Sequence, residues 1–135
     1  MAYYDPIKQI HKMREEQEIL RDRIAKLQAS IESISPKMDK LNIKATAFNT
    51  FEERMAILVD MKTQLMEREA VIQRNINRVM DACRKLPHNQ MTVIYWRIEG
   101  LTFEQIGTMS HYSTTSVYYS YRHAIQSLKE LKIDM

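Results

Sequence analysis

The sequence has very few of the residues that break helices or cross-link chains. Of its 135 residues, two are glycine, three are proline and one is cysteine. Glycine and proline mark the turns between β-strands, and no alternating apolar segment is bounded by such turns, so a sheet is not expected. The single cysteine, Cys83, excludes a disulfide within the chain and a cysteine-rich zinc site. It lies on an apolar stripe, so we expect a buried and unreactive thiol.

Long apolar runs are also missing. No segment approaches the roughly twenty consecutive apolar residues of a membrane span, and the N-terminus lacks the apolar core of a signal peptide. We therefore expect a cytoplasmic protein that does not bind membranes. The four histidines do not have the spacing of metal ligands. No glycine-rich phosphate loop, Ser/His/Asp arrangement or pair of catalytic carboxylates stands out, so we expect neither an enzyme nor a metal or cofactor site.

The residues that are present are typical of a helical protein, with 44% hydrophobic and 27% charged residues. A first segment, between Pro6 and Pro36, has apolar residues at alternating spacings of three and four, which is a heptad seam. Asp5 is its expected N-cap, and Pro36 is expected to end it. The seam comprises Ile10, Met13, Gln17, Leu20, Ile24, Leu27, Ile31 and Ile34, with Gln17 as its one polar member.

A second heptad seam follows in the next segment, up to Leu86. Lys62 and Glu69 interrupt it, and Met61, Met66 and Val71 offer apolar neighbours in their place. Its members are Phe51, Met55, Leu58, Lys62, Leu65, Glu69, Ile72, Ile76, Val79, Cys83 and Leu86. The stretch between Pro36 and Thr50 is long enough for the two helices to fold back antiparallel. We predict a long helical hairpin that also self-associates, as a dimer or tetramer, with the seams pairing within or between chains.

The stretch from Leu101 to Leu128 predicts two short helices joined by a tight turn. Thr102 and Gln105 form the capping box of the first helix, and Ser113 is the N-cap of the second. Apolar stripes at helical spacing follow both caps: Phe103, Ile106 and Met109 in the first helix, and Val117, Tyr121, Ala124, Ile125 and Leu128 in the second. Two such helices can place the second one in a DNA major groove. An ordinary helical hairpin with a solvated polar side has the same pattern.

A family resemblance extends over this part of the chain, which reads L-P-H-N-Q-M-T-V-I-Y-W-R-I-E-G-L-T-F-E-Q-I-G from Leu86. It resembles region 4 of bacterial sigma-70-type factors, which typically begins with Leu-Pro, continues through an apolar helix to an Arg, and then reads E-G-(L/Y)-(S/T)-(Y/F)-E-E-I-A. The resemblance continues without a gap to Leu128. The whole chain, with its long helical N-terminal part, is similar to the ArpU and RinA type of late-gene transcriptional regulators of phages.

This resemblance implies an all-α fold in which residues 1–86 form a helical hairpin for oligomerisation and residues 87–135 form a helix-turn-helix DNA-binding domain. It implies a sequence-specific transcriptional regulator, an activator of late packaging and morphogenesis genes, that binds double-stranded DNA and host RNA polymerase in the bacterial cytoplasm. The candidate DNA contacts are Ser113, Thr114, Thr115, Ser116, Tyr118, Tyr119 and Arg122. The candidate phosphate contacts are Arg97, Thr102, Gln105 and His123.

The sequence departs from the sigma pattern in two places and in its charge. Gly107 occupies a position that is usually Ala, and Tyr118, Tyr119 and Ser120 follow Val117 where Lys and Arg are usual. Residues 1–86 hold 16 Lys and Arg against 13 Asp and Glu, which accounts for the net charge of +3, whereas residues 87–135 hold 4 against 4. Because DNA affinity depends on phosphate neutralisation, a neutral DNA-binding domain should bind weakly as one copy. A homo-oligomer on two half-sites, or added contacts with polymerase, would compensate.

Two other functions fit the same features. A small terminase subunit of a phage also combines a helix-turn-helix with oligomerising helices, which it uses to recognise a packaging site. A ring of many subunits would favour that function, and a dimer or tetramer would favour the regulator. The neutral charge of residues 87–135 fits a third function, in which the domain binds polymerase or a repressor and never contacts DNA.

Overall fold

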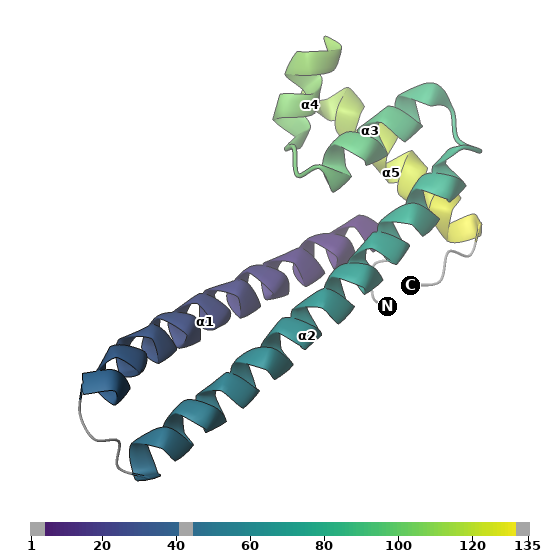
Figure 1. Cartoon of the computed structure of the whole chain (residues 1–135). Coiled ribbons are helices and arrows are strands. Elements are labelled where there is room, and N and C mark those ends of the chain that lie inside the picture. Colours follow the sequence, from purple (N-terminus) through teal and green to yellow (C-terminus); the bar gives the residue numbers. More distant parts are fainter. Residues whose placement is uncertain (1–4, 41–44, 132–135) are drawn as a thin grey trace. The chain divides into compact units, whose positions relative to one another are not determined.

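The structure, a computed structural model, describes residues 5–40 and 45–131, with side chains at 5–34 and 50–131. The described residues form five α-helices and no strand, which confirms the expected all-α fold (Figure 1). The helices are α1 (Pro6–Lys40), α2 (Ala45–Cys83), α3 (His88–Ile98), α4 (Phe103–Ser110) and α5 (Thr114–Glu130). Within these ranges, no helix combines the length and the apolar character needed to cross a membrane.

The first helix does not end at Pro36, so that prediction is wrong: α1 continues to Lys40. A proline inside a helix removes one N–H donor, and the helix can bend there instead of ending. Here the donor is lost one turn before the last helical residue, where little helix remains to be disrupted. The second helix begins at Ala45, so most of the connection predicted between Pro36 and Thr50 is helical, and residues 41–44 lie outside the described part.

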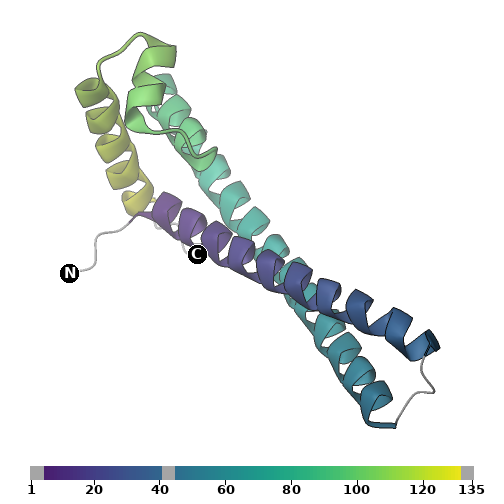
Figure 2. The same cartoon turned by 90° about the vertical axis from the view of Figure 1, so that its left-hand side faces the viewer.

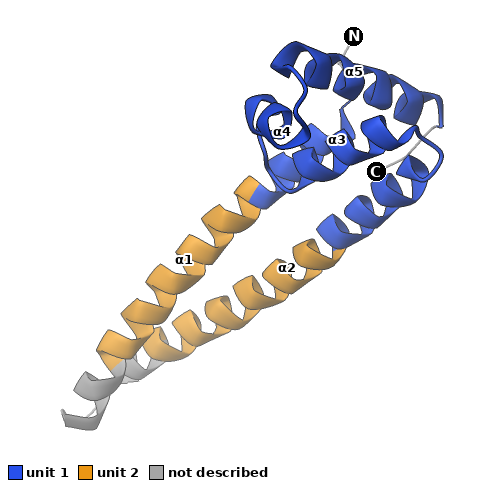
Figure 3. Cartoon of the chain, turned by 90° about the horizontal axis from the view of Figure 1, so that it is seen from above, with its two compact units in different colours: residues 1–14, 71–135 blue, residues 15–70 orange. Residues whose placement is uncertain are grey.

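The chain forms two compact units (Figure 3). One unit contains Met1–Arg14 and Val71–Met135, and the other contains Glu15–Ala70. Each unit has its own apolar core. Both long helices contribute to both units, so the compact units divide the chain at other points than the boundary expected after residue 86. That boundary stays a prediction about which parts fold separately.

In the unit of residues 15–70, α1 and α2 lie side by side and run in opposite directions (Figure 1). Its core consists of Leu20, Ile24, Ile31 and Leu58, with Leu27, Phe51, Met61 and Leu65 packed against it. Met61 packs against this core, and the predicted seam residues Met55 and Lys62 are exposed. Met61 therefore takes the core position that the seam predicted for Lys62, because burying a methionine side chain does not remove a charge from water.

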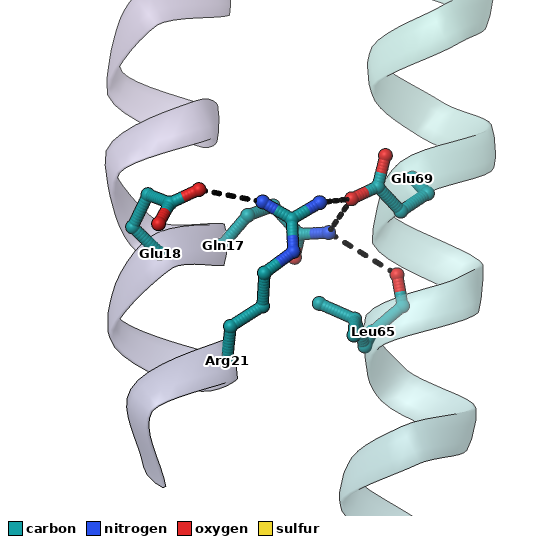
Figure 4. A network of polar contacts seen from close by, with 5 residues as sticks. All are labelled: Gln17, Glu18, Arg21, Leu65 and Glu69. Atoms are coloured by element: carbon teal, nitrogen blue, oxygen red, sulfur yellow. Dashed lines mark hydrogen bonds and ion pairs between the residues drawn. The ribbon is translucent and has the colours of Figure 1, made fainter. Parts of the chain in front are cut away.

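The polar members of the two seams meet in this unit (Figure 4). Gln17 is only 1% exposed, and its Nε2 donates to the Leu65 carbonyl at 3.2 Å and to Glu69 Oε1 at 3.1 Å. Arg21 pairs with Glu69 and, at 2.6 Å, with Glu18. A buried amide that loses its partners is costly, by about 1–3 kcal/mol. Sliding the helices along each other would separate Gln17 from Glu69, so this polar layer fixes the register of the pair.

The other unit packs α3, α4 and α5 with the first turns of α1 and the last turns of α2. The predicted apolar stripe of the last helix is confirmed, because its five members are all buried: Val117, Tyr121, Ala124, Ile125 and Leu128. The stripe predicted for α4 is only partly correct. Ile106 is buried, but Met109 is 53% exposed, because it lies in the last turn of a short helix that packs mainly through its middle.

The start of α1 belongs to this unit and is held there by a buried carboxylate. Asp5 caps α1, because its Oδ1 accepts from the backbone N–H of Ile7 at 3.0 Å and of Lys8 at 3.1 Å. This confirms the predicted N-cap. The Tyr121 hydroxyl lies 2.7 Å from both carboxylate oxygens. Ile7 is fully buried beside this cap, so α1 begins inside the same core that α5 covers.

Two further side chains of α1 contact the end of α3. His11 Nε2 lies 2.6 Å from the Arg97 carbonyl oxygen, and Arg14 donates to the Ile98 carbonyl. Since a carbonyl only accepts, His11 Nε2 is the donor of this hydrogen bond. The last carbonyls of a helix have no helical partners and form the negative end of its dipole. The side chains of His11 and Arg14 therefore donate hydrogen bonds to carbonyls at the C-terminal end of α3.

A first prediction concerns Cys83, which is fully buried. Burial raises the pKa of its thiol from 9.0 to about 11, which lowers the thiolate fraction near pH 8 by about hundredfold, and the thiolate is the reactive form. Alkylation by iodoacetamide should therefore be at least about hundredfold slower in the folded protein than in guanidinium chloride. Mass spectrometry of the labelled protein measures both rates, and equal rates would contradict the burial.

A second prediction concerns the hydrogen bonds between Tyr121 and Asp5. Tyr121→Phe removes the donor and leaves a buried carboxylate with fewer partners, so the free energy of unfolding should fall by about 1.5–3 kcal/mol. Tyr119→Phe is the matched control, because Tyr119 is 58% exposed, and it should change stability by less than about 0.5 kcal/mol. Urea unfolding followed by circular dichroism measures both. Equal stability of the two variants would contradict a stabilising contact between Tyr121 and Asp5.

Candidate nucleic-acid interface

The site predicted from the sequence begins with the cap of α4. Gln105 N donates to Thr102 Oγ1 at 3.1 Å, and Thr102 N donates to Gln105 Oε1 at 2.9 Å. These reciprocal bonds confirm the predicted capping box. Both side chains are exposed and use their acceptor atoms in the cap. The hydroxyl proton of Thr102 and the amide group of Gln105 are the donors that a phosphate would require.

The start of α5 has a similar cap, also as predicted. Ser113 Oγ accepts from the backbone N–H of Ser116 at 3.1 Å and lies 3.0 Å from its hydroxyl. The next two residues, Thr114 and Thr115, are exposed on the first turn. The first N–H groups of a helix form the positive end of its dipole. Four hydroxyls, including those of the cap, thus lie at the end of α5 that favours negative charge.

The connection between α4 and α5 is very short (Figure 2). His111 has a left-handed backbone, with φ 63° and ψ 24°, and the Tyr112 N–H donates to the Gly107 carbonyl at 3.1 Å. A Cβ atom added to Gly107 would lie 2.8 Å from the Tyr112 carbonyl oxygen. This close approach explains why position 107 is glycine.

One side of α5 carries an exposed stripe of four residues, Thr115, Tyr118, Tyr119 and Arg122. Their spacing of three and four places them together on the helix. The Arg122 guanidinium carbon lies 5.9 Å from the centre of the Tyr118 ring, and its NH1 is 3.4 Å from the Tyr118 hydroxyl. Tyr118 also meets Tyr119 and Phe103 edge to face, at 5.9 and 5.6 Å between ring centres. The stripe is therefore an ordered cluster of rings with one guanidinium.

Arg97, predicted as a phosphate contact, makes several contacts inside its unit. Its guanidinium carbon lies 4.6 Å from the centre of the Phe103 ring and 5.7 Å from that of Tyr121. Its NH1 donates to the Leu101 carbonyl at 2.8 Å. Such cation–π contacts hold a guanidinium in place. The contact with phosphate stays a prediction, and so does that of His123, which is exposed next to the stripe.

The sequence did not predict two parts of this region. Phe103 was expected only in the core, yet it links Arg97 to Tyr118, and nothing in its spacing indicated those partners. A cavity of about 380 Å³ also lies between α3, α4 and the first turns of α5. Its lining includes the apolar Val93, Ile106 and Val117 and the hydroxyls of Ser110, Ser116 and Ser120. Within the described residues, no group of three His, Cys, Asp or Glu side chains comes together to hold a metal ion.

The turn beside this site leads to a third prediction. Gly107→Ala should gain roughly 1 kcal/mol of helix propensity, but the new methyl group meets backbone at 2.8 Å and cannot be accommodated by a side-chain rotation. We expect a net loss of about 1–2 kcal/mol in the free energy of unfolding. Thr108→Ala, at an exposed position of the same helix, is the control and should stay within about 0.5 kcal/mol. A more stable Gly107→Ala variant in urea unfolding would be the contrary result.

Comparison of the chain with protein-family models, with curated proteins and with solved structures found no match. The function proposed below therefore rests on the residues and geometry of the chain itself.

Proposed function

We propose that this protein is a sequence-specific DNA-binding transcriptional regulator that acts as a homo-oligomer. In this proposal α4 and α5 form a helix-turn-helix, and α5 is the recognition helix in the major groove. The helices α1 and α2 form the hairpin through which copies associate. The observation that carries the proposal is the exposed stripe of Thr115, Tyr118, Tyr119 and Arg122 on α5, because it lies on a helix whose other side is fully buried.

The chemistry of the stripe fits DNA better than a solvated surface. Arg122 has the donors to bind guanine O6 and N7 together, and the methyl group of Thr115 suits the methyl group of thymine. The phenols of Tyr118 and Tyr119 are typical phosphate contacts. The hydroxyls of Ser113, Thr114 and Ser116 would add contacts at the start of the helix, with Thr102, Gln105, Arg97 and His123 as the further phosphate contacts of the proposal.

The order within the stripe also supports binding. Tyr118 is held edge-on by Phe103 and lies beside Arg122. A guanidinium that rests near a fixed ring loses less side-chain freedom on binding than one that is fully solvated. This arrangement compensates in part for the absence of the additional Lys and Arg that the sigma pattern has at this place.

The charge distribution supports the homo-oligomer. Residues 87–135 hold equal numbers of acidic and basic residues, so one copy neutralises few phosphates. Each phosphate contact contributes a slope of about −0.9 to the dependence of log affinity on log salt. Two copies on two half-sites would add their contacts, and host RNA polymerase bound beside them would add more. The resemblance to sigma region 4 and to phage late regulators supports promoter binding and activation of late genes in a bacterial host.

The neutral charge also supports a second candidate function, in which this domain binds polymerase or a repressor and not DNA. The two candidates differ in one measurable property. The regulator protects a specific duplex in the absence of any other protein, whereas the interaction protein does not.

A fourth prediction tests the regulator. In a mobility-shift titration over the promoters of its own genetic element, at low salt, the protein should bind a specific duplex. Arg122→Ala should weaken specific binding by about 10- to 100-fold, since a bidentate base contact contributes roughly 1–3 kcal/mol. Thr115→Ala should weaken it by about three- to tenfold. Arg23→Ala removes the same charge from an exposed position in the other unit and should leave affinity within about twofold.

The outcomes separate the roles of the residues. No bound duplex among these promoters at low salt would refute the regulator and favour the interaction protein. An Arg122→Ala variant that loses the same affinity for random and for specific DNA would make Arg122 a phosphate contact, because base contacts alone discriminate between sequences.

A further inference from the structure

A further heptad seam, here called the outer seam, lies on the exposed side of α2. It is distinct from the predicted seam that packs on α1, the inner seam. Its spacing alternates between three and four, as in a helix that pairs with another helix. Two of its members are large and exposed, Val59 at 59% and Met66 at 73%. Among the described residues 15–34 of α1, the one exposed large apolar side chain is Ile19. The outer seam consists of Ala56, Val59, Thr63, Met66 and Ala70, all exposed.

The composition of this outer seam suits close contact between helices. Ala56, Thr63 and Ala70 are small and recur every seven residues, so they line one edge of the seam. The Thr63 hydroxyl donates to the Val59 carbonyl at 3.0 Å within the same helix. Covering the seam would therefore bury no unpaired hydroxyl, and the methyl groups of Thr63 and Val59 would remain for packing.

The charges beside the outer seam select the partner and its direction. With the small residues at heptad position a and Val59 and Met66 at d, Lys62 is at g and both Asp60 and Glu67 are at e. In a parallel pair, a residue at g lies beside the residue at e in the next heptad of the partner. Lys62 would then meet Glu67 of a second copy, twice by symmetry. An antiparallel pair brings the two e sides together, which places acidic residues beside acidic residues.

We propose that the outer seam of α2 binds the same seam of a second copy in parallel, in a two-fold symmetric dimer. This rests on the self-association in the proposed function and names its surface. Each seam residue lies against its own counterpart. Because both copies of α2 run in the same direction, the segments that follow Cys83 leave the pair from the same end. A regulator that binds two half-sites needs its two DNA-binding segments to start from the same end of the dimer.

Single cysteines test the direction of the pair. Ala56→Cys and Ala70→Cys, made separately, place a thiol at two points about 21 Å apart along α2. In the parallel dimer each variant should form a disulfide-linked dimer on mild oxidation, because each cysteine lies opposite its own copy. In an antiparallel pair at most one of the two positions lies near its own copy, so cross-linking of one variant alone would overturn the parallel arrangement.

Two controls accompany the cross-linking. Gln64→Cys carries an exposed thiol on a different side of the same helix and should not cross-link. The unchanged protein should not cross-link either, because its Cys83 is fully buried. Cross-linking of Gln64→Cys as extensive as that of the seam variants would show random collision and would overturn the proposal.

A charge exchange tests the same contact without oxidation. Lys62→Glu should weaken dimerisation by about tenfold in analytical ultracentrifugation without DNA, because two exposed ion pairs become repulsive. The double variant Lys62→Glu with Glu67→Lys should restore the affinity to within about twofold. A double variant as weak as Lys62→Glu, or an unchanged protein that is monomeric at every concentration, would overturn the proposed surface. A dimer that binds no DNA would instead refute the proposed function and leave the surface standing.

Discussion

The arrangement of the C-terminal helices depends on the contact between the Tyr121 hydroxyl and the Asp5 carboxylate. A buried carboxylate is stable only when hydrogen bonds replace its water. Asp5 obtains them from the first turn of α1 and from the middle of α5, so neither helix can move without leaving the charge unpaired. His11 and Arg14 extend the same contact to the end of α3. Residues near the N-terminal end of the chain therefore hold in place the helices that present the candidate interface.

This constraint explains how α5 presents its outer side. Its apolar stripe is fixed by the core, and Tyr121 is the polar point that holds that stripe in one position. The exposed stripe around Arg122 then occupies a defined place, with Phe103 and Tyr118 limiting its movement. Order of this kind favours affinity, because less freedom is lost on binding. It does not supply charge, and for that reason the proposed function requires more than one copy.

The helices, their caps and the core stripe of α5 were predictable from the sequence because they depend on local spacing and on short-range hydrogen bonds. Pro36 was misleading because a proline near a helix end removes only one bond. Gln17 and Glu69 each interrupt the apolar pattern of a seam, and both interruptions are visible in the sequence. That the two side chains contact each other can be inferred only once the antiparallel register of the helices is known. The contacts of Asp5 with Tyr121 join residues far apart in sequence, and no local pattern contains them.

In the proposed dimer, one helix distinguishes two partners: α2 packs on α1 through its inner seam and on a second copy through its outer seam. Met66 has the spacing of an apolar substitute in the interrupted inner seam of α2, yet it is 73% exposed and belongs to the outer seam. The contact of Gln17 with Glu69 turns a different side of α2 towards α1. Each seam has its own polar pair: the amide of Gln17 donates to Glu69 on the inner side, and in the proposed dimer Lys62 pairs with Glu67 of the second copy on the outer side. Exchanging the partners would leave Gln17 buried without its acceptors and would separate Lys62 from its counter-charge. Specificity of this kind comes from the penalty of the wrong pairing as much as from the strength of the right one. The polar residues in the inner seam and beside the outer seam therefore allow the fold within one chain and the proposed contact between two chains to use the same helix.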